Sequence, residues 1–182
     1  MKGMKMTIEN SVTLAIAKKE ELPKFKKDLQ ASFAVAVVET FGSTLDGPIP
    51  SDEDIEASFN ESGAVIYHIL SNGEKVGGAV VTINELTQHN ALSFFFICVN
   101  AHGKGMGTQA WKAIEERHPK TKVWETHTPY FEKRNIHFYV NKCGFHIVEY
   151  FNKHHIDTHS PHDHNLPEDE DFFRFEKTMK EP

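Results

Sequence analysis

FFFICVNAHGKGMGT, residues 94 to 108, is the most informative stretch of this chain. It opens with six apolar residues, as expected for a buried strand, and continues into three alternating glycines, Gly103, Gly105 and Gly107. Glycine has no Cβ, so the backbone can turn tightly and approach a ligand closely, and the first turn of a following helix offers unpaired N–H groups. The stretch therefore predicts a strand, a phosphate-binding turn and a helix in succession.

The composition of the whole chain is that of one globular domain. It has 182 residues, 39% of them hydrophobic, so we expect a single domain over residues 1–182, with residues 1–10 as a loosely ordered start. No apolar run approaches the ~20 residues of a membrane span, and no signal peptide is recognisable. The two cysteines give no disulfide framework. These features predict a cytoplasmic protein that does not bind membranes.

The charge of the chain bears on its partners. The formal net charge is −6, and no basic stripe or arginine-rich arm interrupts it. A polyanion such as nucleic acid is therefore not an expected partner, whereas a small cationic substrate is compatible with this charge.

Hydrophobic periodicity divides the chain into strands and helices. Alternating segments joined by short polar turns predict an antiparallel meander before the glycine turn, and helical and extended segments alternate after it. The expected strands are residues 11–17, 64–70, 75–84, 91–99, 122–128, 145–151 and 172–179, and the expected helices are residues 20–41, 51–63, 105–118 and 132–142.

The glycine turn admits three interpretations. It could be purely structural, although three alternating glycines exceed what one turn needs. It also matches the dinucleotide fingerprint G-x-G-x-x-A through Gly105, Gly107 and Ala110, with Glu125 as a ribose-binding acid. A dinucleotide-binding fold, however, places this turn after its first strand and not after a meander.

The third interpretation is a resemblance to a family. Residues 102–107, HGKGMG, resemble the acetyl-CoA signature Q/R-x-x-G-x-G/A of the GNAT superfamily of N-acetyltransferases, with His102 at the position of Gln or Arg. Residues 135–145, NIHFYVNKCGF, resemble the late helix of that family, which ends in Y-x-x-x-G-F. The resemblance covers nearly the whole chain. It implies an α/β (α+β) fold with a central, twisted, mixed and mostly antiparallel sheet of six to seven strands, flanked by about four helices.

Tyr139 departs from the family pattern by one residue. It stands five positions before Gly144, whereas the family tyrosine stands four before. One position on an α-helix is a rotation of ~100°. Either the helix holds an extra residue near Cys143, or Tyr139 points elsewhere.

The resemblance implies acetyl-CoA as the acyl donor. Backbone N–H groups of the turn would bind its pyrophosphate, the strand edge would pair with its pantetheine arm, and an N–H near Val99 would polarise the thioester carbonyl. The implied cofactor-binding residues are Ile97, Cys98, Val99, His102, Gly103, Lys104, Gly105, Met106, Gly107, Thr108, Asn135 and Phe138.

The implied reaction is N-acetylation of a primary amine of a small molecule or peptide by direct attack. A phenol stays protonated at neutral pH, so Tyr139 would protonate the departing thiolate, with Tyr130 as a substitute. The attacking ammonium must first lose a proton. Glu125 is the first candidate for that base and His127 the second, because both leave one strand on one face, and Glu39 is a distant third.

Residues 152–171 form a polar, histidine-rich loop. Its imidazoles and carboxylates are able to bind Zn²⁺ or Ni²⁺, but their spacing fits no fixed scaffold, so we predict no specific metal site. A solvated loop or a lid over a cationic amine are the alternatives. The residues concerned are His154, His155, Asp157, His159, His162, Asp163 and His164.

Two further functional classes stay open. One is an NAD(P)-binding oxidoreductase that uses the Gly105, Gly107 and Ala110 fingerprint. The other is a non-catalytic CoA- or metal-sensing protein. A homodimer is compatible with either class and with an acetyltransferase.

Overall fold

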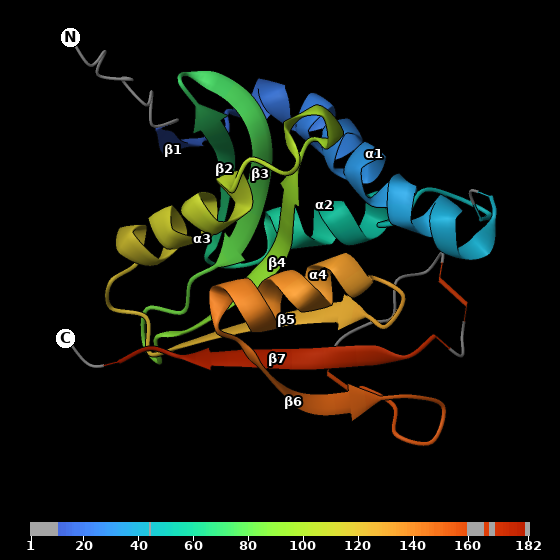
Figure 1. Ribbon diagram of the computed structural model, residues 1–182. Coiled ribbons are helices and arrows are strands. Elements are labelled where there is room, and N and C mark those ends of the chain that lie inside the picture. Colours follow the sequence, from blue (N-terminus) through green and yellow to red (C-terminus); the bar gives the residue numbers. More distant parts are fainter. Residues whose placement is uncertain (1–10, 44, 160–165, 168–169, 181–182) are drawn as a thin grey trace, which may run out of the picture.

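The structure is a computed structural model that describes residues 11–180, except residues 44, 160–165 and 168–169. Seven strands form one sheet in the order β1-β2-β3-β4-β5-β7-β6 (Figure 1). Strands β1 to β4 are antiparallel neighbours, β4 and β5 are parallel, and β7 lies antiparallel between β5 and β6. The strands are β1 (Val12–Ile16), β2 (Ala64–Ser71), β3 (Glu74–Thr82), β4 (His89–Ile97), β5 (Val123–Pro129), β6 (His146–Phe151) and β7 (Phe172–Thr178).

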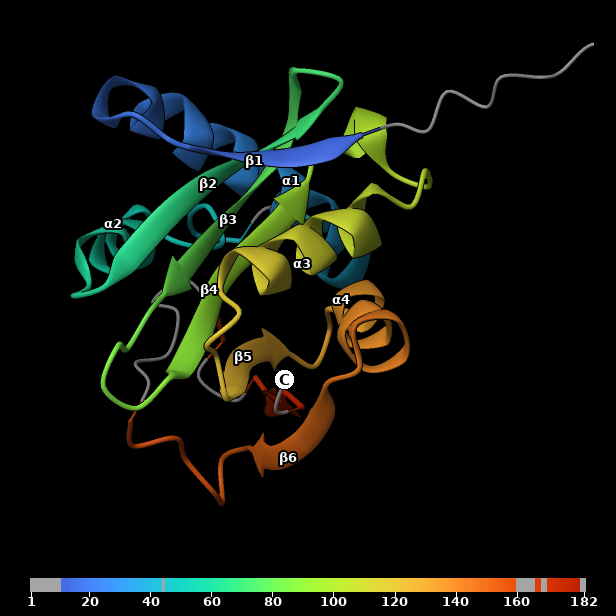
Figure 2. The same ribbon diagram turned by 90° about the vertical axis from the view of Figure 1, so that its left-hand side faces the viewer.

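Helices cover both faces of the sheet. Helices α1 and α2 lie on one face, and α3 and α4 lie on the other (Figures 1 and 2). One short 3₁₀ turn precedes α1, and a second one follows β4. A π-helix continues α4. The helices are α1 (Leu22–Phe41), α2 (Asp52–Asn60), α3 (Met106–Arg117), α4 (Lys133–His137) and the π-helix η3 (Phe138–Cys143), with the 3₁₀ turns at Lys19–Glu21 and Val99–Ala101.

Side chains that alternate along β3 contribute to hydrophobic clusters on both faces of the sheet. Ala79 and Val81 pack with Trp111 of α3, whereas Val80 between them packs on the opposite face with Phe25 of α1 and Ile55 of α2. All three β3 side chains are fully buried. Strand β3 is therefore covered on both sides, which fixes the helices against the middle of the sheet.

Local sequence explains several element ends. Asn72 and Gly73 both have positive φ, 51° and 84°, as the tight turn of the β2–β3 hairpin requires. Ser51 caps α2 by accepting a hydrogen bond from the N–H of Asp54 at 3.1 Å. Gly42 ends α1 in the left-handed region.

The predicted fold class is confirmed, with seven strands in a mixed, mostly antiparallel sheet and four α-helices. The dinucleotide-binding interpretation does not fit this sheet, because that fold needs several parallel βαβ units and only β4 and β5 run parallel here. Within the described residues, the helices are too short or too polar to cross a membrane.

Candidate active site

The site begins where β4 and β5 separate. The two strands pair only over His89–Ala91 and Val123–Glu125, although both continue further. Immediately beyond the last pair, the Thr126 hydroxyl donates to the carbonyl oxygen of Leu92 at 2.8 Å. This side-chain bond ends the ladder. The remaining edge of β4 therefore faces the fork between the two strands.

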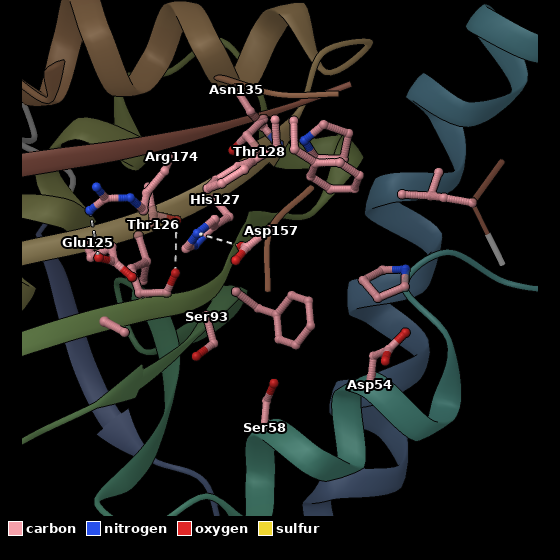
Figure 3. A pocket seen from close by; sticks show the side chains of 18 of the residues that line it. Asp54, Ser58, Ser93, Glu125, Thr126, His127, Thr128, Asn135, Asp157 and Arg174 are labelled. Carbon is pink, nitrogen blue, oxygen red and sulfur yellow. Dashed lines mark hydrogen bonds and ion pairs between the residues drawn. The ribbon is translucent and has the colours of Figure 1, made fainter. Parts of the chain in front are cut away.

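A β-bulge bends β4 at the same point. Val80 pairs with Phe94 and Val81 pairs with Leu92, which leaves Ser93 as an extra, unpaired residue on β4. A bulge of this kind sharpens the local twist and re-aims a side chain. Ser93 accordingly lines the cleft described below (Figure 3).

The glycine turn follows β4 and leads into α3. Gly103 and Gly105 have φ of 80° and 71°, and a Cβ added to either would meet no atom within 4 Å. The first backbone hydrogen bond at this helix end is donated by Gln109 to Gly105, so the preceding N–H groups of α3 have no helical partner. The turn is therefore an open backbone cradle at a helix N-terminus, which fits a diphosphate.

Two neighbouring residues shape this cradle. His102 Nε2 donates to the carbonyl oxygen of Ile97 at 2.6 Å, so this side chain fixes the turn to the end of β4. A Cβ at Gly107 would lie 3.2 Å from Cε2 of Phe138, so this glycine permits close packing of α3. Lys104 and Thr108 are exposed on the cradle, and Met106 is buried beneath it.

The one-residue offset of Tyr139 has a structural explanation. Residues Phe138–Cys143 form a π-helix, in which the backbone holds one residue more per turn than an α-helix. The turn closes at Gly144, whose φ is 81°, and the N–H of Phe145 donates to the carbonyl oxygen of Tyr139 at 2.9 Å. The helix thus contains the extra residue. Tyr139 and Asn135 both line the cleft.

A cleft of about 960 Å³ adjoins the fork between β4 and β5 (Figure 3). Its walls come from α1 and α2, the fork itself, and the ends of β6 and β7. Phe33, Phe94 and Phe131 give it apolar surface. Its charged lining is mainly acidic, with five carboxylates and one guanidinium, which favours a cationic ligand. These residues are Asp54, Glu61, Glu125, Glu149, Asp157 and Arg174.

Glu125 is held in an ion-pair network. Arg174 donates from Nη1 to Glu125 at 3.1 Å and to Glu176 at 2.5 Å, and from Nε to Glu149 at 3.0 Å. Glu149 also contacts His155 at 2.9 Å. One arginine of β7 therefore joins carboxylates of β5, β6 and β7. The carboxylate of Glu125 therefore already has a cationic partner.

His127 is two residues along β5 from Glu125 and on the same face. Its ring stacks on Phe151, with centroids 6.2 Å apart and an angle of 22°. Its Nε2 lies 3.6 Å from a carboxylate oxygen of Asp157 (Figure 3). Burial lowers the pKa of His127, while the charges of Glu125 and Asp157 oppose that shift. The imidazole is therefore neutral and able to accept a proton at neutral pH.

The other predicted site residues differ in whether they line the cleft. Tyr139 is buried among Phe145 and Phe175, and burial raises its pKa, so the phenol keeps its proton. Tyr130 and Glu39 are exposed and do not line the cleft. The strand end from Ile97 to Val99 borders the fork and the cradle, and Cys98 is half-buried there.

A family model agrees with this geometry. The model of the acetyltransferase (GNAT) family matches residues 32–145. The chain belongs to the GNAT acetyltransferase family. The uncharacterized protein YrkN of Bacillus subtilis (strain 168) is 57% identical over 182 residues, which cover 97% of this chain and 98% of that protein.

Solved GNAT structures share the fold. The ribosomal-protein-S18-alanine N-acetyltransferase of Escherichia coli superimposes with a TM-score of 0.67 at 13% identity, over 94% of this chain and 96% of that one. A GNAT family acetyltransferase of Elizabethkingia anophelis with acetyl-CoA bound gives 0.64 at 17% identity, over 94% and 99%. At these identities the likeness concerns the fold alone.

In this GNAT domain, three cleft residues had no place in the sequence interpretation of the site. Arg174, Glu149 and Thr126 come from strands far apart in the sequence, and their proximity is a product of the sheet order. One signal was present for Arg174, which is a charged residue inside the apolar run FFRF. Such a residue in a central strand needs a buried partner.

Proposed function

We propose that this protein is an acetyl-CoA-dependent N-acetyltransferase that acts on a primary amine of a small molecule or peptide. One observation carries the proposal. The fork between β4 and β5 joins an open anion cradle at the end of β4 to a cleft that holds an uncharged imidazole, His127. Binding an acyl donor and removing a proton from an amine are thus possible at one place.

The cradle fits the diphosphate of acetyl-CoA. The N–H groups of residues 103–108 and the N-terminal end of the α3 dipole would hold it, with Lys104 as an exposed cation nearby. Ile97, Cys98 and Val99 would bind the pantetheine arm along the free strand edge. Asn135 of α4 and Phe138 of the π-helix would border the arm from the helical side. The donor itself supplies an activated thioester, which makes the acetyl group reactive.

His127 is the better base of the two candidates on β5. Glu125 is engaged in an ion pair with Arg174 at 3.1 Å, so its carboxylate already has a cationic partner. His127 is partly buried, with 29% of its side chain exposed, and its lowered pKa keeps it neutral at pH 7. We therefore assign proton removal from the ammonium to His127, and we assign Glu125 to the electrostatics of the cleft.

Proton balance also requires a donor for the departing sulfur. The amine nitrogen forms a bond to the acetyl carbon, the carbon–sulfur bond breaks, and the sulfur must be protonated to leave as a thiol. Tyr139 lines the cleft and stays protonated, because burial raises its pKa. We assign the phenol this role, and the amide nitrogen then returns its surplus proton to solvent or to the phenolate.

The acceptor is expected to be a cation. Five carboxylates and one guanidinium line the cleft, so an ammonium is attracted and an anionic acceptor is repelled. Aromatic side chains in the same lining accommodate a carbon chain beside the amine. We therefore expect the acceptor to be a small amine or the end of a basic peptide. An acidic peptide should be a poor acceptor.

A thiol-release assay with an amine panel tests the proposal. The panel comprises linear polyamines, monoamines, amino acids and peptides, and we expect thiol release with cationic members. His127→Gln should lower kcat on the order of a hundredfold, because a positioned general base contributes about 10²–10⁴. Calorimetry should show that acetyl-CoA affinity is unchanged in this variant.

Two results would change the assignment. Acetyl-CoA at a hundredfold excess over its Kd should stabilise the fold by about 2.7 kcal/mol, and no stabilisation would argue against a CoA site. Binding without thiol release from any amine would favour the alternative of a non-catalytic CoA sensor. A metal sensor has less support, because no three metal-ligating side chains gather within the described residues, although His162, Asp163 and His164 lie outside them.

A further inference from the structure

The described part of the histidine-rich loop, residues 152–159, packs against β6 beside the proposed site. Asn152 and His155 exchange two backbone hydrogen bonds of 2.9 Å and close a tight turn. The His155 side chain binds Glu149 at 2.9 Å, and its ring is parallel to Phe151, with an angle of 2°. This part of the loop is therefore anchored on β6.

The anchored turn brings Asp157 to the ring of His127. The two come from β5 and from the loop, 30 positions apart in the sequence, and Figure 3 shows them facing one another. The Asp157 side chain is only 11% exposed, and one of its oxygens accepts the N–H of His159 at 2.8 Å. The second oxygen lies 3.6 Å from Nε2 of His127. One oxygen of the carboxylate is thus fixed by a backbone hydrogen bond, and the other faces the imidazole.

The ring itself is restrained on a second side. Phe151 stacks with the ring of His127 and also with the ring of His155. The 3.6 Å separation is within ion-pair range and longer than a hydrogen bond. Catalytic contacts of this length tighten when a substrate binds.

Four charged groups face His127. Glu125 lies on its own strand, Glu149 on β6, Arg174 on β7 and Asp157 on the loop. The three carboxylates raise the pKa of His127, and burial and Arg174 lower it. Glu125 and Glu149 are already shared with Arg174. Asp157 is the carboxylate in direct ion-pair contact with the imidazole.

We propose that Asp157 is a positioning residue for the reaction, holding His127 through Nε2 so that Nδ1 takes the proton of the acceptor ammonium. The inference rests on the proposed function. An Nε2–H directed at a carboxylate leaves Nδ1 as the unprotonated nitrogen. When Nδ1 receives the proton, the imidazolium is stabilised by the charge of Asp157, and the amine is left neutral for attack.

Proton NMR of the imidazoles tests the contact without any turnover. The His127 signal is assigned by its loss in His127→Gln, and its pKa is measured in the wild type and in Asp157→Asn. Removing a carboxylate beside an imidazolium should lower the pKa of His127 by about one unit or more. Asp157→Glu keeps the charge and should retain most of the wild-type pKa. An unchanged pKa in Asp157→Asn would overturn the inference.

Kinetics test the positioning role. In Asp157→Asn, kcat with the best amine should fall about ten- to a hundredfold, with the acid limb of the pH profile moved to lower pH and KM for the amine almost constant. A rise in KM with an unchanged kcat would instead show that Asp157 binds the acceptor and would overturn the role. The matched control is Asp171→Asn, because Asp171 binds Tyr150 and does not line the cleft. It should leave the kinetics and the His127 pKa unchanged.

Different results would contradict the proposed function and the role of Asp157. Absence of thiol release from the wild type with every amine contradicts the proposed function, whatever the NMR result. A wild-type enzyme that is active, with a His127 pKa that does not respond to Asp157→Asn, contradicts the inference alone.

Discussion

Glu132 immediately precedes α4 as its N-cap residue and is almost wholly buried, at 4% exposure. Its Oε1 has no hydrogen-bond partner among the described residues, and burial raises its pKa to about 7. Arg134 opposes that rise and Glu39 adds to it. A buried, uncompensated carboxyl group is a cost to the fold once it ionises.

This cost gives a prediction on stability. In the unfolded chain Glu132 releases its proton near its ordinary pKa of 4.5, whereas the folded protein holds it up to about pH 7. Between these values the folded state binds more protons, so the free energy of unfolding falls as pH rises, by about 3 kcal/mol in total. Glu132→Gln should remove this loss. Urea unfolding at pH 5 and pH 8 checks it, and equal pH dependence in both proteins would contradict it.

At the scale of elements, the cradle depends on left-handed glycines. Gly105→Ala puts a Cβ on a backbone at φ 71°, which costs about 1–2 kcal/mol, and places a methyl group in the space that a diphosphate would occupy. Gly42→Ala carries the same backbone strain at φ 75°, at the end of α1 and outside the cradle. Both variants should lose similar stability in urea unfolding.

Ligand binding separates these two variants. Acetyl-CoA affinity, measured by calorimetry, should fall on the order of tenfold or more in Gly105→Ala and stay unchanged in Gly42→Ala. Equal affinity in the two would place the diphosphate elsewhere.

The late helix shows how element geometry depends on more than local sequence. Strict alignment with the family pattern puts Val140 at the position of the family's tyrosine, and α-helical geometry would then point Tyr139 away. The π-helix at Phe138–Cys143 absorbs the difference. A π-turn has no sequence signature of its own, so the sequence could state the two alternatives without choosing between them.

At the scale of the whole molecule, Arg174 joins three strands of the sheet. Arg174→Met would leave Glu125, Glu149 and Glu176 close together without a cation. Because these side chains are partly exposed, we expect a loss of about 1–2 kcal/mol at pH 7. The loss should be smaller at pH 4, where carboxylates take up protons. Arg117→Met on the exposed end of α3 is the control and should change stability by less than about 0.5 kcal/mol.

Urea unfolding at both pH values measures this contribution. A variant as stable as the wild type at pH 7 would show that the ion pairs between β5, β6 and β7 do not contribute to the free energy of unfolding. An equal loss at both pH values would show that the methylene packing of Arg174, and not its charge, is responsible.

The sequence by itself determined the order of elements, the short polar turns of the antiparallel meander, and the glycine turn. These features rest on local causes, namely side-chain periodicity and backbone freedom, which act between neighbours in the chain. It also placed Glu125 and His127 on one face of a strand, because side chains alternate along β-structure.

Only the tertiary structure decided which carboxylates surround these two residues. The order β5-β7-β6 brings Arg174 between Glu125 and Glu149, and the loop after β6 returns Asp157 to His127. These contacts join residues tens of positions apart. The order of strands in a sheet is set by non-local packing. The sequence of one strand therefore does not show which charged residues of other strands will lie beside it.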